Sequence, residues 1–158
     1  MNQSAVEAFQ KLINTVTAFI GQHALDDVLE NKLNEQFPAT GSLVRSIEKA
    51  CHRGIQEGWM CQYEAGGIRY GRVIKPGAAT AGFSVDVVEM DSLAGPHHRH
   101  PNGEIDLILP QTETAQFDQR GAGWLVYPPN SAHSPTVEGG KALILYLLPG
   151  GEIEFTRA

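Results

Sequence analysis

The first third of the chain has the hydrophobic spacing of amphipathic helices. Between residues 4 and 20, apolar side chains recur at steps of three and four, which places them on one face of a helix. The same period continues over residues 24–37 and again from residue 42 to about 57. Pro38 ends the second stretch, because proline lacks the backbone donor that a helix interior requires. The pattern predicts three helices.

After residue 59 the hydrophobic period changes to two, which is typical of half-buried strands. Turn signals such as Gly66-Gly67, Asn102-Gly103 and Gly139-Gly140 separate the alternating segments. Short strands at this spacing favour an antiparallel sandwich or barrel. The predicted strands cover residues 60–64, 68–74, 83–90, 105–109, 115–118, 124–127, 142–148 and 153–155.

The length of 158 residues suits one buried core rather than two independent ones. We therefore divide the chain into an N-terminal helical extension, residues 1–58, and a β-barrel, residues 59–158. The extension is expected to pack on the barrel or on a partner subunit. The apolar stripe of its first helix is wider than a small barrel covers, so we also expect a homodimer or a larger closed assembly.

Charge and cysteine content narrow the partners and the compartment. The formal net charge is −6 and no basic run exceeds two residues, which argues against a nucleic-acid partner and against an anionic membrane surface. No apolar stretch approaches the roughly 20 residues of a membrane span, and the N-terminal pattern is not that of a signal peptide. Cys51 and Cys61 have no metal-type spacing and are expected to be reduced thiols of a cytoplasmic protein.

Candidate chemistry is concentrated in the histidines, four of which fall between residues 97 and 133. On a strand, His98 and His100 point to the same face, whereas His97 and Arg99 point to the other. The Pro101-Asn102-Gly103 turn then reverses the chain, so Glu104 begins the returning strand beside them. Two imidazoles and a carboxylate in one place form a site suited to Fe(II), Mn(II), Ni(II) or Zn(II). Farther along the chain, His133 follows the next predicted turn.

This pattern resembles the two motifs of the cupin superfamily. The first motif, His-x-His, a spacer and Glu, corresponds to His98-x-His100-x3-Glu104, and the second, Pro-x-Gly-x2-His, corresponds to Pro128-x-Asn130-x2-His133. Asn130 replaces the motif glycine, and asparagine also tolerates the left-handed backbone that such a turn needs. The resemblance covers residues 66–155 and implies a cupin β-barrel with one divalent metal held by His98, His100, Glu104 and His133.

Further residues are candidates for the same pocket. Asp106 shares the strand face of Glu104, so it is either a proton-transfer group or a hydrogen-bond partner that orients a histidine. Tyr70 and Arg72 share another strand face; Arg72 either binds a carboxylate or lies solvated at a sheet edge. Trp124 and Tyr127 have opposite parity, so at least one is expected inside, either as core packing or against an aromatic substrate.

Within the cupins, the segments 97–110 and 124–137 resemble the 4-hydroxylaminobenzoate lyases of nitroaromatic degradation. That resemblance implies a lyase that forms 3,4-dihydroxybenzoate and ammonia from a small aromatic acid. Asp106 and Glu104 would then be catalytic, and Arg72, Tyr70, Trp124 and Tyr127 would bind the substrate. Two alternatives stay open at this point, because one fold hosts many functions. They are a non-catalytic cupin that binds a small molecule and an oxygen-dependent aromatic-ring dioxygenase.

Overall fold

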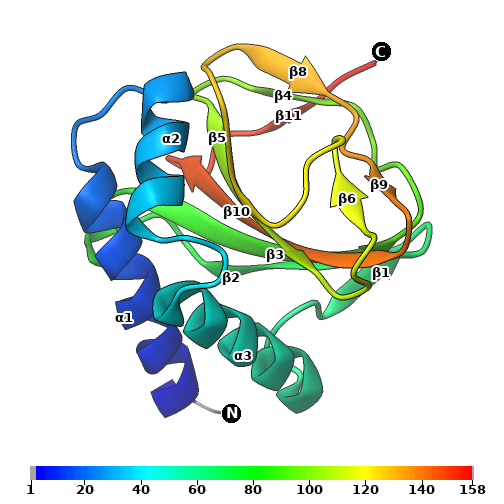
Figure 1. Ribbon diagram of the computed structural model, residues 1–158, viewed down its shortest axis with the longest axis horizontal. Helices are drawn as coiled ribbons and strands as arrows, with labels where there is room; N and C mark the ends of the chain where they lie inside the picture. The colour runs from blue at the N-terminus through cyan, green and yellow to red at the C-terminus, as the bar shows by residue number, and fades with distance from the viewer. Residues whose placement is uncertain (1–2, 158) are drawn as a thin grey trace.

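The computed structural model describes residues 3–157 and confirms a mainly β architecture with N-terminal helices (Figure 1). The helices are α1 (Gln3–Ile20), α2 (Asp27–Gln36) and α3 (Ser42–Glu57), and a short 3-10 helix, η1, covers Ala78–Thr80. The strands are β1 (Tyr63–Ala65), β2 (Ile68–Ile74), β3 (Phe83–Asp91), β4 (His98–His100), β5 (Glu104–Pro110), β6 (Gln116–Phe117), β7 (Gly123–Tyr127), β8 (Ser131–His133), β9 (Val137–Glu138), β10 (Lys141–Pro149) and β11 (Glu154–Phe155).

The helix ends follow from local capping. The carboxylate of Asp26 accepts a hydrogen bond from the Leu29 backbone N–H at 3.0 Å, so α2 begins at Asp27, three residues later than predicted. Helix α3 ends at Gly58, whose φ of +86° is a left-handed conformation that glycine adopts without steric cost. The short strands β8 and β9 were not predicted.

The strands form three antiparallel sheets. The largest has the order β1-β2-β3-β10-β5-β7, the second has the order β11-β4-β8, and β6 pairs with β9. The barrel is thus a sandwich of sheets and not one continuously hydrogen-bonded ring. In Figure 1, α1 and α2 lie at the left and α3 at the bottom of the molecule, and β4, β8 and β11 lie at the top.

Two hydrophobic clusters lie on opposite faces of the six-stranded sheet. Alternate side chains of its central strands, such as Leu145 and Leu107, pack with the helices in the first cluster. Their neighbours, such as Ile144 and Ile108, belong to the second cluster, which fills the inside of the sandwich. The expected boundary between residues 58 and 59 therefore separates helices from strands in sequence, while the first core joins them in space.

The apolar face of α1 is covered by the chain itself. Phe9, Ile13, Val16 and Ile20 are each at most 1% exposed. The large apolar side chains that are exposed among residues 3–157 are Val28, Tyr63, Tyr70 and Phe155. We expected a dimer because we judged the apolar face of α1 too wide for the barrel to cover. Since the chain itself buries that face, this reason for a dimer no longer holds. None of the described helices is both long and apolar enough to cross a membrane.

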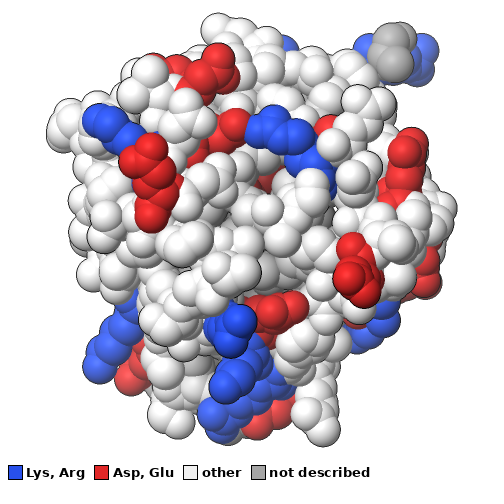
Figure 2. Space-filling model, in the orientation of Figure 1, with Lys and Arg blue, Asp and Glu red and all other residues white. Residues whose placement is uncertain are grey.

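Figure 2 shows the charges on one face of the molecule: basic side chains gather at its lower edge, in the region of α3, with acidic side chains beside them, and elsewhere the two signs are scattered. Several basic groups are paired directly: Arg53 with Glu57 at 3.0 Å, Arg69 with Glu89 at 3.2 Å, and Arg120 with Glu30. Each of these pairs joins one arginine to one carboxylate.

Helix α2 covers the free edge of β7, the last strand of the large sheet. The Asn34 amide bonds to both backbone groups of Trp124, accepting from its N–H at 2.9 Å and donating to its carbonyl at 3.0 Å. Glu30 accepts from the backbone N–H of Val126 at 2.9 Å, and the Trp124 indole donates to the Phe37 carbonyl at 2.9 Å. Side chains thus complete an edge that would otherwise present unpaired donors and acceptors.

We predict that Asn34→Ala lowers the free energy of unfolding by about 2–3 kcal/mol, because it leaves two backbone groups of a partly buried edge without partners. Urea denaturation measures the change. Asn31→Ala on the exposed face of the same helix is the matched control and is expected to stay within about 0.5 kcal/mol of the parent. Equal stability of the two variants would show that the Asn34 bonds contribute nothing.

Candidate metal centre

Strand pairing and one tight turn assemble the histidine cluster. In the β4–β8 pair, His98 lies directly opposite His133. The turn into β5 passes through Gly103, whose φ is +89°; a Cβ there would lie 2.8 Å from the Tyr127 carbonyl oxygen and 2.7 Å from a Leu25 methyl group. Only glycine fits this position. The turn brings Glu104 back beside the two histidines of β4, as the sequence predicts.

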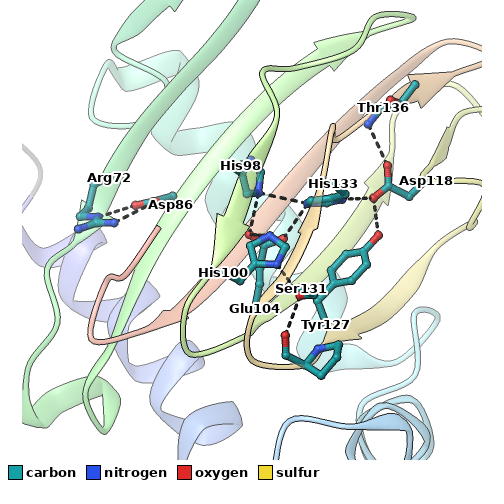
Figure 3. A network of polar contacts seen from close by, with 11 residues as sticks. Arg72, Asp86, His98, His100, Glu104, Asp118, Tyr127, Ser131, His133 and Thr136 are labelled. Atoms are coloured by element: carbon teal, nitrogen blue, oxygen red, sulfur yellow. Dashed lines mark hydrogen bonds and ion pairs between the residues drawn. The ribbon is translucent and has the colours of Figure 1, made fainter. Parts of the chain in front are cut away.

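The four predicted ligands converge on one point (Figure 3). One ligand atom from each of His98, His100, Glu104 and His133 can be chosen so that all four atoms lie within 4.8 Å of one another. Glu104 Oε1 lies 3.1 Å from His100 Nε2 and 3.5 Å from His98 Nε2, and Glu104 Oε2 lies 3.7 Å from His133 Nε2. The Nε2 atoms of His98 and His133 are 3.1 Å apart.

Burial makes a cation the natural partner of this cluster. Glu104 is completely buried, and neither of its carboxylate oxygens has a hydrogen-bond partner within residues 3–157. His100 Nε2 is likewise buried and without a hydrogen bond. Burial alone would raise the pKa of Glu104, but the imidazoles of His100, His133 and His98 hold that pKa well below its usual range. A buried anion ringed by imidazole nitrogens therefore fits a divalent transition metal, and these residue types suit Fe, Mn, Ni or Zn.

Hydrogen bonds on the far side of the imidazoles fix their orientation. Asp118 Oδ2 lies 2.6 Å from His133 Nδ1, and Ser131 Oγ lies 2.9 Å from His100 Nδ1. These contacts leave Nε2 of each ring facing Glu104. Such partners set the tautomer of a metal-binding histidine and increase its basicity.

Sequence reasoning missed Asp118. This residue also accepts hydrogen bonds from the Tyr127 hydroxyl and, at 2.9 Å, from the backbone N–H of Thr136. Burial would raise the pKa of Asp118, but its hydrogen bonds with His133, Tyr127 and Thr136 lower that pKa below the ordinary value. It has a left-handed φ of +48° just after β6, and no spacing relation ties it to His133. Only the folded chain places the two side chains together.

Asp106 lies on the same inner face of β5 as Glu104, as predicted. It is completely buried, and both of its carboxylate oxygens lack a hydrogen-bond partner among the described residues. Burial, followed by the negative charge of Glu104, raises its pKa well above the ordinary value. Because no histidine of the cluster is bonded to it, the structure gives no support to a role in orienting an imidazole.

A cavity of about 490 Å³ adjoins the cluster and reaches it through His98. The rings of Tyr63 and Tyr70 lie 5.8 Å apart, and the Phe155 ring lies 6.0 Å from that of His98. These three exposed aromatic side chains all line the cavity. Its other lining residues are mainly apolar and include Ile68, Val88, Met90 and Ile153.

Arg72 and Tyr70 both line this cavity, so the strand face that they share is the inner one. The Arg72 guanidinium already binds Asp86, with Nε to Oδ1 at 2.8 Å and Nη2 to Oδ2 at 3.4 Å, and Nη2 also donates to the Gly151 carbonyl at 3.2 Å. Figure 3 shows this pair apart from the histidine cluster. The arginine is therefore neither a free clamp nor a simply solvated edge residue.

The two predicted aromatic residues of β7 separate to opposite faces. The ring of Tyr127 lies on the inner face, 4.5 Å from His133 and 5.4 Å from His100 between ring centroids. Trp124 is 2% exposed and packs in the helix-facing core. The expectation that Trp124 contacts the substrate is therefore not retained, because its strand parity directs it away from the cavity. His97 and Arg99 point outward as expected, toward Thr156 and Glu154.

The motif residues and the sheet topology together define the class: this is a cupin fold with a candidate His3Glu metal site. Among solved structures, the DMSP lyase DddQ from Ruegeria pomeroyi DSS-3 aligns over 95% of this chain and 96% of its own, with a TM-score of 0.52 at 17% identity. An RmlC-like cupin protein from Ralstonia eutropha JMP134 aligns over 58% of this chain and 60% of its own, with a TM-score of 0.44 at 12% identity.

The chain belongs to the 4-hydroxylaminobenzoate lyase family, whose model (PnbB) matches residues 11–155. A relative named 4-hydroxylaminobenzoate lyase from Nocardioides sp. (strain LMS-CY) is 30% identical, with 92% of this chain and 94% of the relative covered. One with the same name from Pseudomonas putida is 31% identical, with 80% and 82% covered. The chain is thus a lyase enzyme built on the cupin fold.

We predict that His98→Ala and His133→Ala each lose the metal, because removing one of four ligands weakens binding far more than removing an outlying residue. Elemental analysis of purified protein gives the metal content per chain. His97→Ala is the matched control: it lies beside His98 but contacts Thr156, so it is expected to keep about one metal ion per chain. Retention of metal in both ligand variants would refute the assignment.

Proposed function

We propose that this protein is a metal-dependent lyase that converts 4-hydroxylaminobenzoate to 3,4-dihydroxybenzoate and ammonia, in the degradation of nitroaromatic compounds. The observation that carries the proposal is a buried His3Glu cluster that opens, through His98, onto a cavity with aromatic walls and an arginine. The names of the two relatives supply the substrate.

The overall chemistry suits a site without an organic cofactor. The reaction breaks the N–O and C–N bonds, takes up one water and releases ammonia. The nitrogen is reduced while ring carbon is oxidised, so electrons balance within the substrate and no dioxygen is needed. What the protein must supply is help for the departing hydroxyl group, a path for the protons of the added water, and a fixed orientation of the ring.

The residues present match these needs. His98, His100, Glu104 and His133 would hold a divalent metal ion, which when bound supplies a Lewis acid for the N–O group or for water. Glu104 contributes the negative charge of the ligand set. Asp106 lies two residues beyond it on the same strand face, where its carboxyl group would carry a proton to or from the reacting water.

Substrate binding falls to the cavity. The Arg72 guanidinium has five N–H donors, and Asp86 and Gly151 take only part of this capacity, so the rest can bind the substrate carboxylate. Tyr70 at the exposed rim would lie against the ring. Tyr127 would act closer to the metal, since its ring lies beside His133 and His100.

We also propose that the protein works in the cytoplasm. Cys51 and Cys61 are both buried free thiols, which supports a reducing compartment. Burial raises the pKa of Cys61 to about 11, so the thiol stays protonated and unreactive at neutral pH.

We predict that purified, metal-loaded protein converts 4-hydroxylaminobenzoate without dioxygen and releases one ammonia for each 3,4-dihydroxybenzoate formed. Anaerobic incubation, with chromatography for the product and an enzymatic ammonia assay, measures both. The His98→Ala variant is the inactive control. Turnover that requires dioxygen would replace the lyase with a ring dioxygenase, and tight binding of the substrate without conversion would indicate a binding protein.

We predict that Asp106→Asn lowers kcat by about a hundredfold or more, the usual scale of a lost proton-transfer group, because the amide keeps the size of the side chain but cannot exchange the proton. Steady-state kinetics gives kcat, and elemental analysis verifies that the metal remains bound. Normal turnover of this variant would make Asp106 a structural residue.

A further inference from the structure

A row of polar side chains crosses the inner face of the six-stranded sheet. Strand register places Arg72 opposite Asp86, Asp86 opposite Tyr146, and Tyr146 opposite Asp106. Directly paired residues of antiparallel strands project to the same face, with Cβ atoms about 4.5–5.5 Å apart. The row therefore runs from the arginine in the cavity to the buried acid beside Glu104, with Tyr146 as its third member.

Tyr146 occupies the boundary between the cavity and the buried acids. It lines the cavity, whereas Asp106 is completely buried and is not among the lining residues. The Tyr146 ring packs 6.3 Å from the Phe117 ring and is only 6% exposed. Its hydroxyl makes no hydrogen bond to any residue from 3 to 157, in contrast to the Tyr127 hydroxyl, which donates to Asp118.

The surroundings of the Tyr146 hydroxyl also keep it protonated, so that it can donate a hydrogen bond. Burial, and then the negative charges of Glu104 and Asp106, raise its pKa well above the ordinary value. A phenol among carboxylates therefore keeps its hydrogen and donates it in a hydrogen bond without giving it up. Tyr146 lines the cavity, so this donor without a protein partner is available to a bound ligand, and a ligand group that accepts from it gains one hydrogen bond.

We propose that Tyr146 is a substrate-contacting residue whose hydroxyl donates a hydrogen bond to the polar group para to the substrate carboxylate. The proposal rests on the proposed function and names a residue that determines specificity within it. Arg72 and Tyr146 are two strands apart, about 9.5 Å at the usual strand spacing. A para-substituted benzoate with its carboxylate near Arg72 would extend its other end toward Tyr146 and the His98 side of the cavity, and its ring would lie among the apolar lining.

The bond would serve both binding and turnover. In the substrate it would hold the hydroxylamine oxygen, on which negative charge develops as the N–O bond breaks, and a donor aimed at such an atom lowers the barrier. In the product it would be made to the 4-hydroxyl group. The site would thereby prefer acids with a polar para group over plain benzoate, because benzoate leaves the Tyr146 donor unpaired.

The test is the binding of two ligands to metal-loaded protein. 3,4-Dihydroxybenzoate and benzoate share the carboxylate and the ring, but only the first can accept a bond from Tyr146. In Tyr146→Phe, which keeps the ring against Phe117, the Kd of 3,4-dihydroxybenzoate should rise about tenfold, the scale of one net hydrogen bond, while that of benzoate stays unchanged. Tyr63→Phe removes a hydroxyl at the exposed rim and is expected to leave the ratio of the two Kd values as in the parent. Calorimetric titration measures the Kd of both ligands for the parent and for the two variants.

Turnover separates this inference from the proposed function. If the parent protein converts 4-hydroxylaminobenzoate, Tyr146→Phe should lower kcat about a hundredfold with its metal content unchanged. Parent-like kcat and an unchanged Kd ratio in Tyr146→Phe would overturn the inference and leave the lyase function standing. If the parent protein is inactive on this substrate, the proposed function fails. Even then, a preference for 3,4-dihydroxybenzoate over benzoate that disappears in Tyr146→Phe would support the hydrogen bond. An unchanged ratio of the two Kd values would reject it. Equal weakening of both ligands would show that Tyr146 only shapes the cavity, which also rejects the donor role.

Discussion

The site depends on one constraint, which is that the Glu104 carboxylate is completely buried. Neither of its oxygens has a hydrogen-bond partner among the described residues. An isolated buried anion is costly in a protein core, and three imidazole nitrogens lie 3.1–3.7 Å from this one, in an arrangement that could hold a metal ion. The surrounding fold serves this requirement. The β4–β8 pair faces two histidines toward each other, and Gly103 returns the chain at a point where any side chain would collide.

The imidazole rings of the cluster are oriented by residues that are not among the four candidate ligands. Asp118 and Ser131 each engage the Nδ1 side of an imidazole, so the opposite nitrogen faces Glu104. Asp118 is itself held by a tyrosine hydroxyl and a backbone N–H, in a left-handed backbone conformation. Backbone conformations of this kind cost free energy and are typical of functional sites, where the surrounding contacts impose them.

The six-stranded sheet divides two tasks between its faces. Its helix-covered face supplies stability through a continuous apolar core, into which Trp124 and the inner side of α1 are packed. Its inner face carries the ionisable groups, Arg72, Asp86, Tyr146 and Asp106, in one row beside the cavity. Because strand side chains alternate, polar groups can line the site without interrupting the core behind it.

The sequence by itself determined the local features of this protein: three helices, the main strands and the candidate metal-binding residues. Period, turn residues and the His-x-His…Glu spacing are properties of neighbouring residues. It also carried enough of the motif to indicate the family. Only the tertiary structure decided what depends on strand register. It directed Trp124 into the helix-facing core, paired Arg72 with Asp86, and brought Asp118 to His133 and Tyr146 to Asp106. No local pattern encodes these contacts, because each joins strands or loops whose separation in sequence is set by the fold.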